Sequence, residues 1–167
     1  MLMPFNLQGW IKEHEHLLKP PVGNYEIFPH GDFIVMAVGG PNSRKDFHIN
    51  EGPEFFYQLK GDVHLKVLEK GEVKDIPLKE GDVFLLPPRT PHSPQRPAGT
   101  VGIVVEHKRK PGEKDGFVWI CDKCHSKLYQ EFVEVTDIVK QMPPIFDRFY
   151  GSVDHTTCKK CGTVATR

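Results

Sequence analysis

Short runs of alternating apolar and polar residues fill the chain from Tyr25 to about His107. In one run Val63, Leu65 and Val67 alternate with polar residues, which is the period of a strand that buries one side and exposes the other. Glycines at ten-residue spacing mark turns between such runs, at Gly61, Gly71 and Gly81. Short strands separated by regular turns predict an all-β sandwich or barrel.

Three further runs support this interpretation. Glu54, Phe56 and Gln58 share one face of the predicted strand upstream of Val63. The run 83–86 leads into two prolines, which end regular pairing because proline lacks the backbone N–H. Residues 101–105 predict another strand, which is followed at once by an acidic residue.

A leader segment, residues 1–24, precedes the β region. Residues 6–18 predict a short helix, and the proline-rich stretch 19–24 predicts a stiff loop. After the β region, residues 108–116 are charged and contain a Pro-Gly pair, so we expect a linker there.

The remaining residues, 117–167, form a C-terminal appendage that carries every cysteine of the chain. Residues 136–150 have helical character, and we expect an interruption at Pro143 and Pro144, where a second helical turn could begin. The sequence therefore predicts two units, a barrel domain with its leader over 1–116 and a metal-binding appendage over 117–167.

The composition narrows the classes of function. With 167 residues, the chain is long enough for one domain and an appendage. Lysine plus arginine equals aspartate plus glutamate, at 22 each, and no long basic patch occurs, so we expect no nucleic-acid partner. The longest apolar run, 33–38, is too short to cross a bilayer, and residues 1–5 lack the features of an export signal. We therefore expect a cytoplasmic protein without membrane contact.

The four cysteines form two pairs of equal spacing, Cys121-x2-Cys124 and Cys158-x2-Cys161. Without an export signal, this pattern indicates a metal site before it indicates disulfides. Each pair forms a knuckle, and four thiolates close a tetrahedral shell around one ion, which favours a structural role over a catalytic one. The arrangement resembles the two knuckles of rubredoxin, so iron and zinc are both compatible with it.

A second candidate metal site is spread over the β region and consists of His48, Glu54 and His92. These residues lie in two spaced signatures, His48-x5-Glu54-x6-Gly61 and Gly81-x5-Pro87-x4-His92. His48 and Glu54 flank a turn, and His92 follows a proline, so all three could meet at one mouth of a barrel. Two imidazoles and one carboxylate are the ligand set of a facial triad on ferrous iron, with positions left open for other ligands.

The two signatures resemble the two motifs of the cupin superfamily, which implies a jelly-roll barrel. The chain departs from those motifs at three positions. Asn50 stands at the second histidine of the first motif, so two histidines and one carboxylate remain. Arg89 and Arg96 replace the inner glycine and the final asparagine of the second motif, and Arg96 places a permanent cation beside the metal.

The resemblance narrows to one family within the cupins, the 3-hydroxyanthranilate 3,4-dioxygenases, and to their bacterial type. The blocks that carry it are Gly39-Gly40-Pro41-Asn42, Glu54-Phe55-Phe56-Tyr57-Gln58-Leu59, 84–88, 91–97, the loop 20–24 and the tail with two cysteine pairs. Together they extend over nearly the whole chain. By position, the resemblance implies that His48, Glu54 and His92 bind a catalytic Fe(II).

The same resemblance assigns four residues to the substrate. It implies that Arg44 and Arg96 hold the substrate carboxylate, for which the planar guanidinium fork is well suited. Glu106 would hydrogen-bond the ring hydroxyl or amine and help to move protons. Asn24 would lie on a loop that covers the substrate.

The implied reaction converts 3-hydroxyanthranilate and dioxygen to 2-amino-3-carboxymuconate semialdehyde, in tryptophan and kynurenine catabolism or in NAD biosynthesis. The family also implies a homodimer. Two alternatives stay open: a cupin dioxygenase for a related aminophenol or catechol acid, and a non-enzymatic, metal-dependent cupin sensor of a small aromatic acid. Arg44 and Arg96 suit a small anionic ligand in every case, so they do not separate enzyme from sensor.

Overall fold

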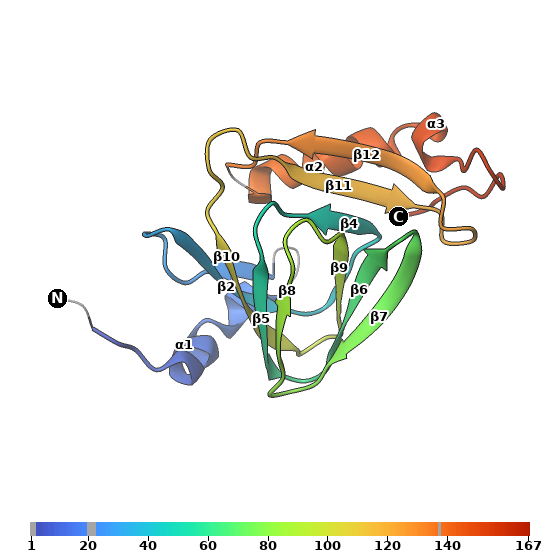
Figure 1. Cartoon of the computed structure of the whole chain (residues 1–167). Coiled ribbons are helices and arrows are strands. Elements are labelled where there is room, and N and C mark those ends of the chain that lie inside the picture. Colours follow the sequence, from blue (N-terminus) through green and yellow to red (C-terminus); the bar gives the residue numbers. More distant parts are fainter. Residues whose placement is uncertain (1–2, 20–22, 137) are drawn as a thin grey trace.

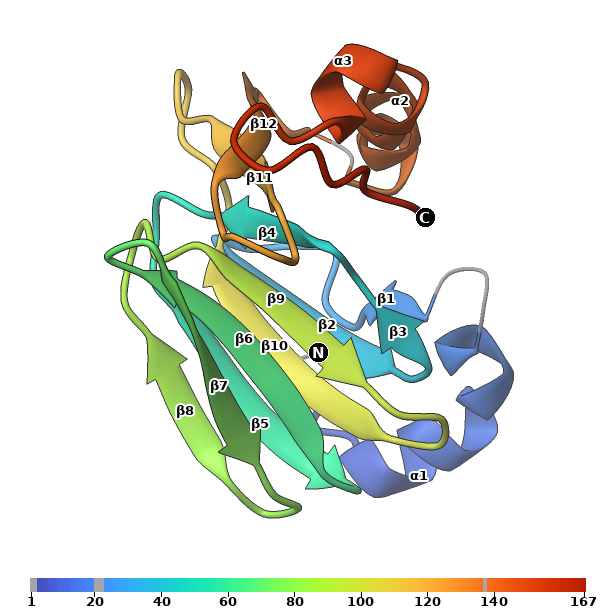
Figure 2. The ribbon, with the colours of Figure 1, turned by 90° about the vertical axis from the view of Figure 1, so that its right-hand side faces the viewer.

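The computed structural model describes residues 3–19, 23–136 and 138–167. Two antiparallel sheets face each other and form a barrel, which confirms the all-β prediction (Figures 1 and 2). A short helix of the leader and the helices of the C-terminal residues lie on different sides of this barrel (Figure 1).

The two sheets are built from strands that lie far apart in the sequence. The first sheet has the order β1 (Asn24–Glu26), β2 (Phe33–Gly39), β10 (Val101–His107), β5 (Glu54–Lys60) and β8 (Val83–Leu86). The second sheet has the order β12 (Lys127–Val133), β11 (Asp115–Ile120), β4 (Asp46–Ile49), β9 (His92–Arg96), β6 (Val63–Glu69) and β7 (Glu72–Leu78), with β3 (Asn42–Ser43) paired to β9.

The core between the sheets consists of the apolar faces that the alternation predicted. Val63, Leu65 and Val67 of β6 are buried against Phe56 of β5. The other buried members of this cluster are Val38, Leu78, Leu86 and Val104. In the same inward-facing rows, buried polar side chains follow the apolar ones: Glu54 is in the row of Phe56, and Glu106 is in the row of Val104. These polar side chains belong to the site described below.

The leader packs on the outer face of the first sheet. Its predicted helix is divided into α1 (Leu7–Glu13) and a 3₁₀ turn (Glu15–Leu18), and Trp10 packs in the cluster around Ala37 and Ile103. Of the predicted loop 19–24, residues 20–22 lie outside the described residues.

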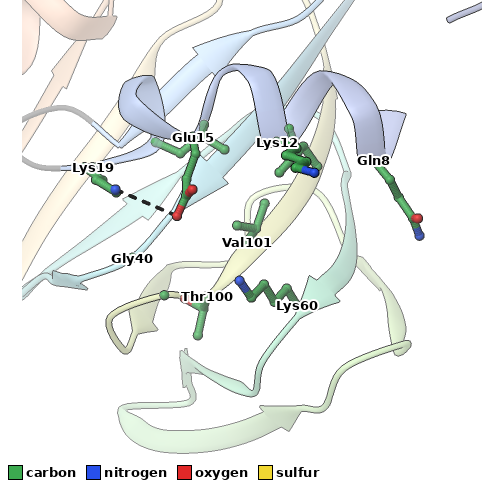
Figure 3. A pocket seen from close by; sticks show the side chains of 11 residues that line it. Gln8, Lys12, Glu15, Lys19, Gly40, Lys60, Thr100 and Val101 are labelled. Carbon is green, nitrogen blue, oxygen red and sulfur yellow. Dashed lines mark ion pairs between the residues drawn. The ribbon is translucent and has the colours of Figure 1, made fainter. Parts of the chain in front are cut away.

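A surface pocket lies between the leader and the ends of the barrel strands (Figure 3). Lys12, Glu15 and Lys19 line it from the leader, and Lys60 and Thr100 line it from the barrel. Glu15 and Lys19 form an exposed ion pair at 3.8 Å. The pocket shares no lining residue with the cavity around His48, Glu54 and His92.

The second sheet continues beyond the barrel into β11 and β12. β11 pairs with β4 of the barrel on one side and with β12 on the other. The predicted linker 108–116 is therefore wrong at its end, because Asp115 and Gly116 are the first residues of β11, and the expected division between residues 116 and 117 falls inside this strand.

Helix α2 (Ile138–Tyr150) covers the face of β11 and β12 that continues the barrel interior, and α3 (Val153–Thr156) follows it. The predicted interruption at Pro143 and Pro144 is wrong, because both prolines lie inside α2. Ile145 and Phe149 of α2 are fully buried against Phe117 and Trp119, so packing stabilises the helix despite the missing N–H groups. No helix among the described residues is long and apolar enough to cross a membrane.

Candidate metal centre and substrate cavity

Two pairs of cross-strand partners bring four ionisable side chains together between the sheets. In the second sheet His48 of β4 lies opposite His92 of β9. In the first sheet Glu54 of β5 lies opposite Glu106 of β10. Because partners in an antiparallel pair project from the same face, each sheet presents its pair to the interior, where all four side chains are buried.

The three predicted metal ligands converge on one point. Nδ1 of His48 lies 3.7 Å from Oε1 of Glu54, and Nε2 of His92 lies 3.3 Å from Oε2 of the same carboxylate. One ligand atom from each residue lies within 4.8 Å of the other two. Two imidazoles and a carboxylate in this arrangement fit a divalent metal of the facial-triad type.

The charges of these residues depend on one another. Burial opposes ionisation of Glu54, but His92 and His48 outweigh it and lower the pKa of Glu54 to about 2. Burial also opposes the charged form of His92, which by itself would lower its pKa. The negative charge of Glu54 outweighs this effect and holds the pKa of His92 above its ordinary value. The carboxylate is therefore ionised at neutral pH, as a metal ligand must be.

His48 is supported from the side of β11, by residues to which the sequence assigned no role. Nε2 of His48 donates a hydrogen bond to Oδ2 of the fully buried Asp115 at 2.7 Å. Phe117 is the cross-strand partner of His48 and stacks on its ring, with centroids 5.3 Å apart. The alternation of Asp115, Phe117 and Trp119 is the signal that could have revealed this strand.

A single arginine joins Asp115 to Glu106. Arg109 donates from Nε and Nη2 to the two oxygens of Asp115, at 2.8 and 2.6 Å. Its third nitrogen, Nη1, lies 2.9 Å from Oε1 of Glu106. Burial, followed by the nearby charge of Glu54, raises the pKa of Glu106, and Arg109 offsets this only in part.

Asn50 stands where the cupin motif has a second histidine, and it contacts both glutamates. Its Nδ2 donates to Oε1 of Glu54 at 3.3 Å and to Oε2 of Glu106. Its Oδ1 accepts a hydrogen bond from the backbone N–H of Gly52 at 3.1 Å, which fixes the amide. An amide that donates to both carboxylates reduces the repulsion between two like charges in a buried space.

Arg96 is buried without a carboxylate partner among the described residues. Nη1 donates to Oε1 of Gln58 at 3.2 Å, and Nε has no hydrogen-bond partner. Burial lowers the pKa of Arg96 to about 10. The guanidinium fits here because position 102 is glycine: a Cβ at Gly102 would lie 2.9 Å from Nη1. A buried cation with an unused donor is a site for an anion.

Gln58 is held so that its oxygen faces Arg96. Its Nε2 lies within hydrogen-bond distance of three backbone carbonyl oxygens, those of Lys60, Gly61 and Val101, at 2.9, 2.8 and 3.2 Å. The amide nitrogen is therefore occupied, and only the carbonyl oxygen is left for the guanidinium.

Arg44 differs from Arg96 in having a partner of opposite charge. Its Nε donates to Oδ1 of Asp46 at 3.1 Å, and its Nη2 pairs with Oδ2 of the same buried carboxylate. Burial opposes the charge of Arg44, but Asp46 outweighs it and holds the pKa of Arg44 above its ordinary value. Arg44 is thus fixed and charged, whereas Arg96 has a free donor.

All the residues that the sequence assigned to the catalytic metal or to the substrate line one cavity. Asn24, Arg44, Arg96 and Glu106 share its wall with the three candidate ligands. Asn24 is not on a loop, however: it is the first residue of β1 and pairs with Val38 of β2, although it directly follows the loop region. The apolar part of the wall consists of Met36, Val38, Phe56, Pro94 and Val104.

Comparison with known proteins decides the family. The model of a family described as 3-hydroxyanthranilic acid dioxygenase matches residues 1–150. The chain belongs to this family. Curated relatives named 3-hydroxyanthranilate 3,4-dioxygenase include one from Xanthomonas euvesicatoria, 53% identical over 97% of this chain and 92% of its own, and one from Shewanella woodyi, 51% identical over 96% and 86%. The recognition made from the sequence is confirmed.

The 3-hydroxyanthranilic acid dioxygenase family is one of enzymes, so its name disfavours a non-enzymatic sensor. Among solved structures, the fold is similar to a cupin-2 domain protein from Shewanella frigidimarina, with 14% identity and a TM-score of 0.48 over 62% of this chain and 100% of the other. The matched residues 1–150 contain the whole cavity wall and the first cysteine pair.

The four cysteines of this family member form a second cluster outside the barrel. Sγ of Cys121 lies 3.6 Å from that of Cys161, and Sγ of Cys124 lies 3.5 Å from that of Cys158. All four sulfurs lie within 4.8 Å of one another, as the two-knuckle prediction requires.

The two knuckles are built alike. The N–H of the residue after each pair, His125 or Gly162, donates at 2.9 Å to the carbonyl of the first cysteine of that pair. Both residues have positive φ, 55° and 72°. A hydroxyl, from Ser126 or Thr163, lies 3.3 Å from the second sulfur. The hydrogen bonds with Thr163 lower the pKa of Cys161 to about 6, which favours the thiolate that a metal binds.

Proposed function

We propose that this protein cleaves the ring of 3-hydroxyanthranilate with dioxygen and forms 2-amino-3-carboxymuconate semialdehyde. The observation that carries the proposal is the position of Arg96, a buried cation with an unused donor, in the same cavity as two imidazoles and a carboxylate. The name of the relatives gives the substrate and the bond that is cleaved. The tryptophan and kynurenine pathways and NAD biosynthesis are the contexts in which this reaction would serve.

Fe(II) is the metal that we propose for His48, Glu54 and His92, because a facial triad of this composition suits non-haem ferrous iron. When bound, it would hold the amine and hydroxyl of the substrate and dioxygen at one centre, which turns an encounter of two reactants into a positioned reaction. The apolar wall formed by Phe56 and Val104 would keep water away from this point.

Arg96 and Arg44 would bind the substrate carboxylate. Arg96 has an Nε without a hydrogen-bond partner and lacks an acidic neighbour among the described residues. A bound anion would accept the hydrogen bond and balance the positive charge. Arg44 is held by Asp46 and would add a second positive charge without moving. Two charge-assisted contacts at one end of the ring would orient it, so that its hydroxyl and amine lie toward the triad.

Glu106 would act at the other end of the ring. It is buried beside Glu54, and its raised pKa favours the protonated form more than in water. The same shift makes the ionised carboxylate of Glu106 a stronger base, so that it can accept a proton from the ring hydroxyl and, once protonated, return it later in the reaction. Asn24 lies at the cavity wall in β1 and would contact the bound substrate from the leader side.

An oxygen-electrode assay tests the proposed function. Protein purified without oxygen and loaded with Fe(II) is expected to consume dioxygen on addition of 3-hydroxyanthranilate and to produce the absorbance of the semialdehyde. Parallel reactions with a related aminophenol acid and a catechol acid define the substrate class. Oxygen uptake with one of these and none with 3-hydroxyanthranilate would favour the alternative cupin dioxygenase, and no uptake with any would defeat an enzymatic function.

We also propose that the four cysteines bind one structural ion, zinc or iron, which anomalous scattering at the two absorption edges identifies. The closed set of thiolates leaves no position for a substrate. Changing both Cys121 and Cys124 to serine is expected to lower the melting temperature or the soluble yield, while the folded fraction keeps its barrel metal and its ring-cleaving activity. The matched control is a double change of two exposed residues of the same segment, Asp122→Asn and Lys123→Gln. An inactive double-serine protein that is folded and retains the barrel metal would contradict the structural role.

The homodimer implied by the family remains a proposal, and the outer face of the first sheet supports it. Phe55 of β5 and Leu85 of β8 are cross-strand partners on that face, and Val83 lies beside them. Their exposed fractions are 38, 63 and 63%. A contiguous apolar face of this kind marks an interaction site, here for a second copy of the chain. Sedimentation equilibrium of the wild-type protein measures the number of copies.

A further inference from the structure

Arg109 is a buried side chain on an exposed connection. The residues that follow it, 110–112, are exposed, yet the side chain of Arg109 is only 8% exposed and points into the barrel. All three of its guanidinium nitrogens are used, two on Asp115 and one on Glu106. Arg109 therefore contacts both Asp115, which hydrogen-bonds His48, and Glu106, which lines the cavity.

Asp115 restricts the ring of His48 to one arrangement. An ionised carboxylate only accepts hydrogen bonds, so the contact of 2.7 Å places the proton of His48 on Nε2. Nδ1 then keeps its lone pair and lies on the side of Glu54, at 3.7 Å. Carboxylates that accept from the second nitrogen of a histidine ligand fix its tautomer and orientation and increase metal affinity.

We propose that Asp115 and Arg109 are positioning residues that couple the metal ligand His48 to the substrate-facing Glu106. The chain of contacts runs from His48 through Asp115 and Arg109 to Glu106, and each link joins buried groups of opposite charge or a donor and an acceptor. The part of the proposal that concerns Glu106 rests on the proposed function, whereas the part that concerns His48 depends only on metal binding.

A purely structural role would also require Asp115 and Arg109 to pair, because two buried charges must compensate each other. The distinction lies in what else each group touches. Besides its two hydrogen bonds with Arg109, Asp115 accepts a third from the proposed metal ligand His48. The third nitrogen of Arg109 contacts Glu106, the acid opposite Glu54. Removal of a merely structural pair changes stability and leaves the metal affinity of the folded protein unchanged.

Titration with Co(II), followed by its visible absorption, measures the affinity of the barrel site without any substrate when the four-cysteine site keeps its own ion, so that added Co(II) fills the barrel site alone. In the variant Asp115→Asn the side chain keeps its size, but it loses its negative charge. Its NH2 group also replaces one of the two oxygens, so it can no longer accept all three hydrogen bonds from His48 and Arg109. Its dissociation constant for Co(II) is expected to rise about 10- to 100-fold, the usual effect of losing such a partner. The matched control is Asp75→Asn, because Asp75 accepts from His64 at 2.8 Å in an exposed pair. The control is expected to bind Co(II) like the wild type.

Arg109→Lys tests the second link. Lysine keeps the charge, but its single nitrogen cannot hold two carboxylates in the geometry of the guanidinium fork. We expect a rise of about fivefold in the Co(II) dissociation constant, and about a tenfold fall in kcat with little change in KM once the metal is saturating. In the double variant, the change in the free energy of Co(II) binding is expected to be smaller than the sum of the changes in the two single variants. Both substitutions interrupt the same series of contacts from His48 to Glu106.

Three outcomes would overturn the proposal: wild-type Co(II) affinity in folded Asp115→Asn, wild-type affinity in Arg109→Lys, or strictly additive effects in the double variant. Circular dichroism and melting of each variant, with the barrel site empty and the four-cysteine site filled, establish that it is folded. If Asp115→Asn does not fold, Arg109→Lys carries the test alone, with the same titration. A wild-type protein that binds Co(II) but cleaves no ring would defeat the proposed function and leave the coupling of His48 to Asp115 to be decided by these affinities.

Discussion

The variant His92→Ala is expected to lose ring cleavage and barrel metal together. His92 is buried and supplies Nε2 at 3.3 Å from Glu54, and the change leaves only His48 and Glu54 to hold the ion. Metal catalysis contributes several kcal/mol to barrier lowering, so kcat should fall by about a thousandfold or more. The measurements are oxygen uptake with 3-hydroxyanthranilate and the metal content of the protein after dialysis.

The control for this variant is His64→Ala. His64 is a histidine of the same barrel that hydrogen-bonds an aspartate, but it is exposed on β6 and lies outside the cavity. It should keep full activity and a full complement of barrel metal. If His92→Ala instead retained the barrel metal and more than about one-tenth of the wild-type kcat, the assignment of the triad would be wrong.

Arg96→Met is expected to raise the KM for 3-hydroxyanthranilate about 100-fold and to leave metal affinity unchanged. Charge-assisted hydrogen bonds are worth about 1.5–3 kcal/mol each, and the substrate carboxylate would lose its contacts with an arginine whose buried Nε has no other partner. Methionine has no charge to bury, and it fills most of the volume that the arginine side chain occupies. Steady-state kinetics and Co(II) titration separate the two effects.

The same variant should unfold at a higher temperature than the wild type. Burial lowers the pKa of Arg96 to about 10, which means that the folded protein without substrate disfavours this charge. A residue that is retained for binding at a cost in stability is expected to show this combination of lost function and gained stability. The control is Arg89→Met, because Arg89 is 73% exposed and pairs with Glu51. An unchanged KM in Arg96→Met would remove this residue from the carboxylate site.

Local patterns in the sequence predicted much of the fold. Alternation at Val63, Leu65 and Val67 revealed which face of β6 is buried, because side chains on a strand point alternately to its two faces. The prolines of α2 misled the prediction, because local preference favours an interruption there, while Ile145 and Phe149 hold the helix against β11. The linker prediction failed at Asp115 for a similar reason: the strand forms by pairing with β4, which is remote in the sequence.

The candidate site was predicted as a set of residue types, and its arrangement was not. Spacing and resemblance pointed to the triad, the two arginines and Glu106, and those roles stay predictions until the experiments above are done. The difference between Arg44 and Arg96 could not be predicted, because it depends on whether a carboxylate lies within reach in space. The contacts of Asp115 and Arg109 could not be predicted either, because their partners lie on other strands or across a turn.

The sequence by itself determined the family and the β-barrel, and it predicted the residue types of both candidate metal sites and the pairing of the cysteines into two knuckles. These properties depend on residue identity and on short spacings along the chain, so they can be recognised without long-range geometry. Only the tertiary structure decided that His48 faces His92 and Glu54 faces Glu106 across neighbouring strands, and that β11 extends the barrel to support His48. Strand pairing joins residues that are distant in the chain, so the register, and with it the direction of each buried charge, exists only in the folded protein.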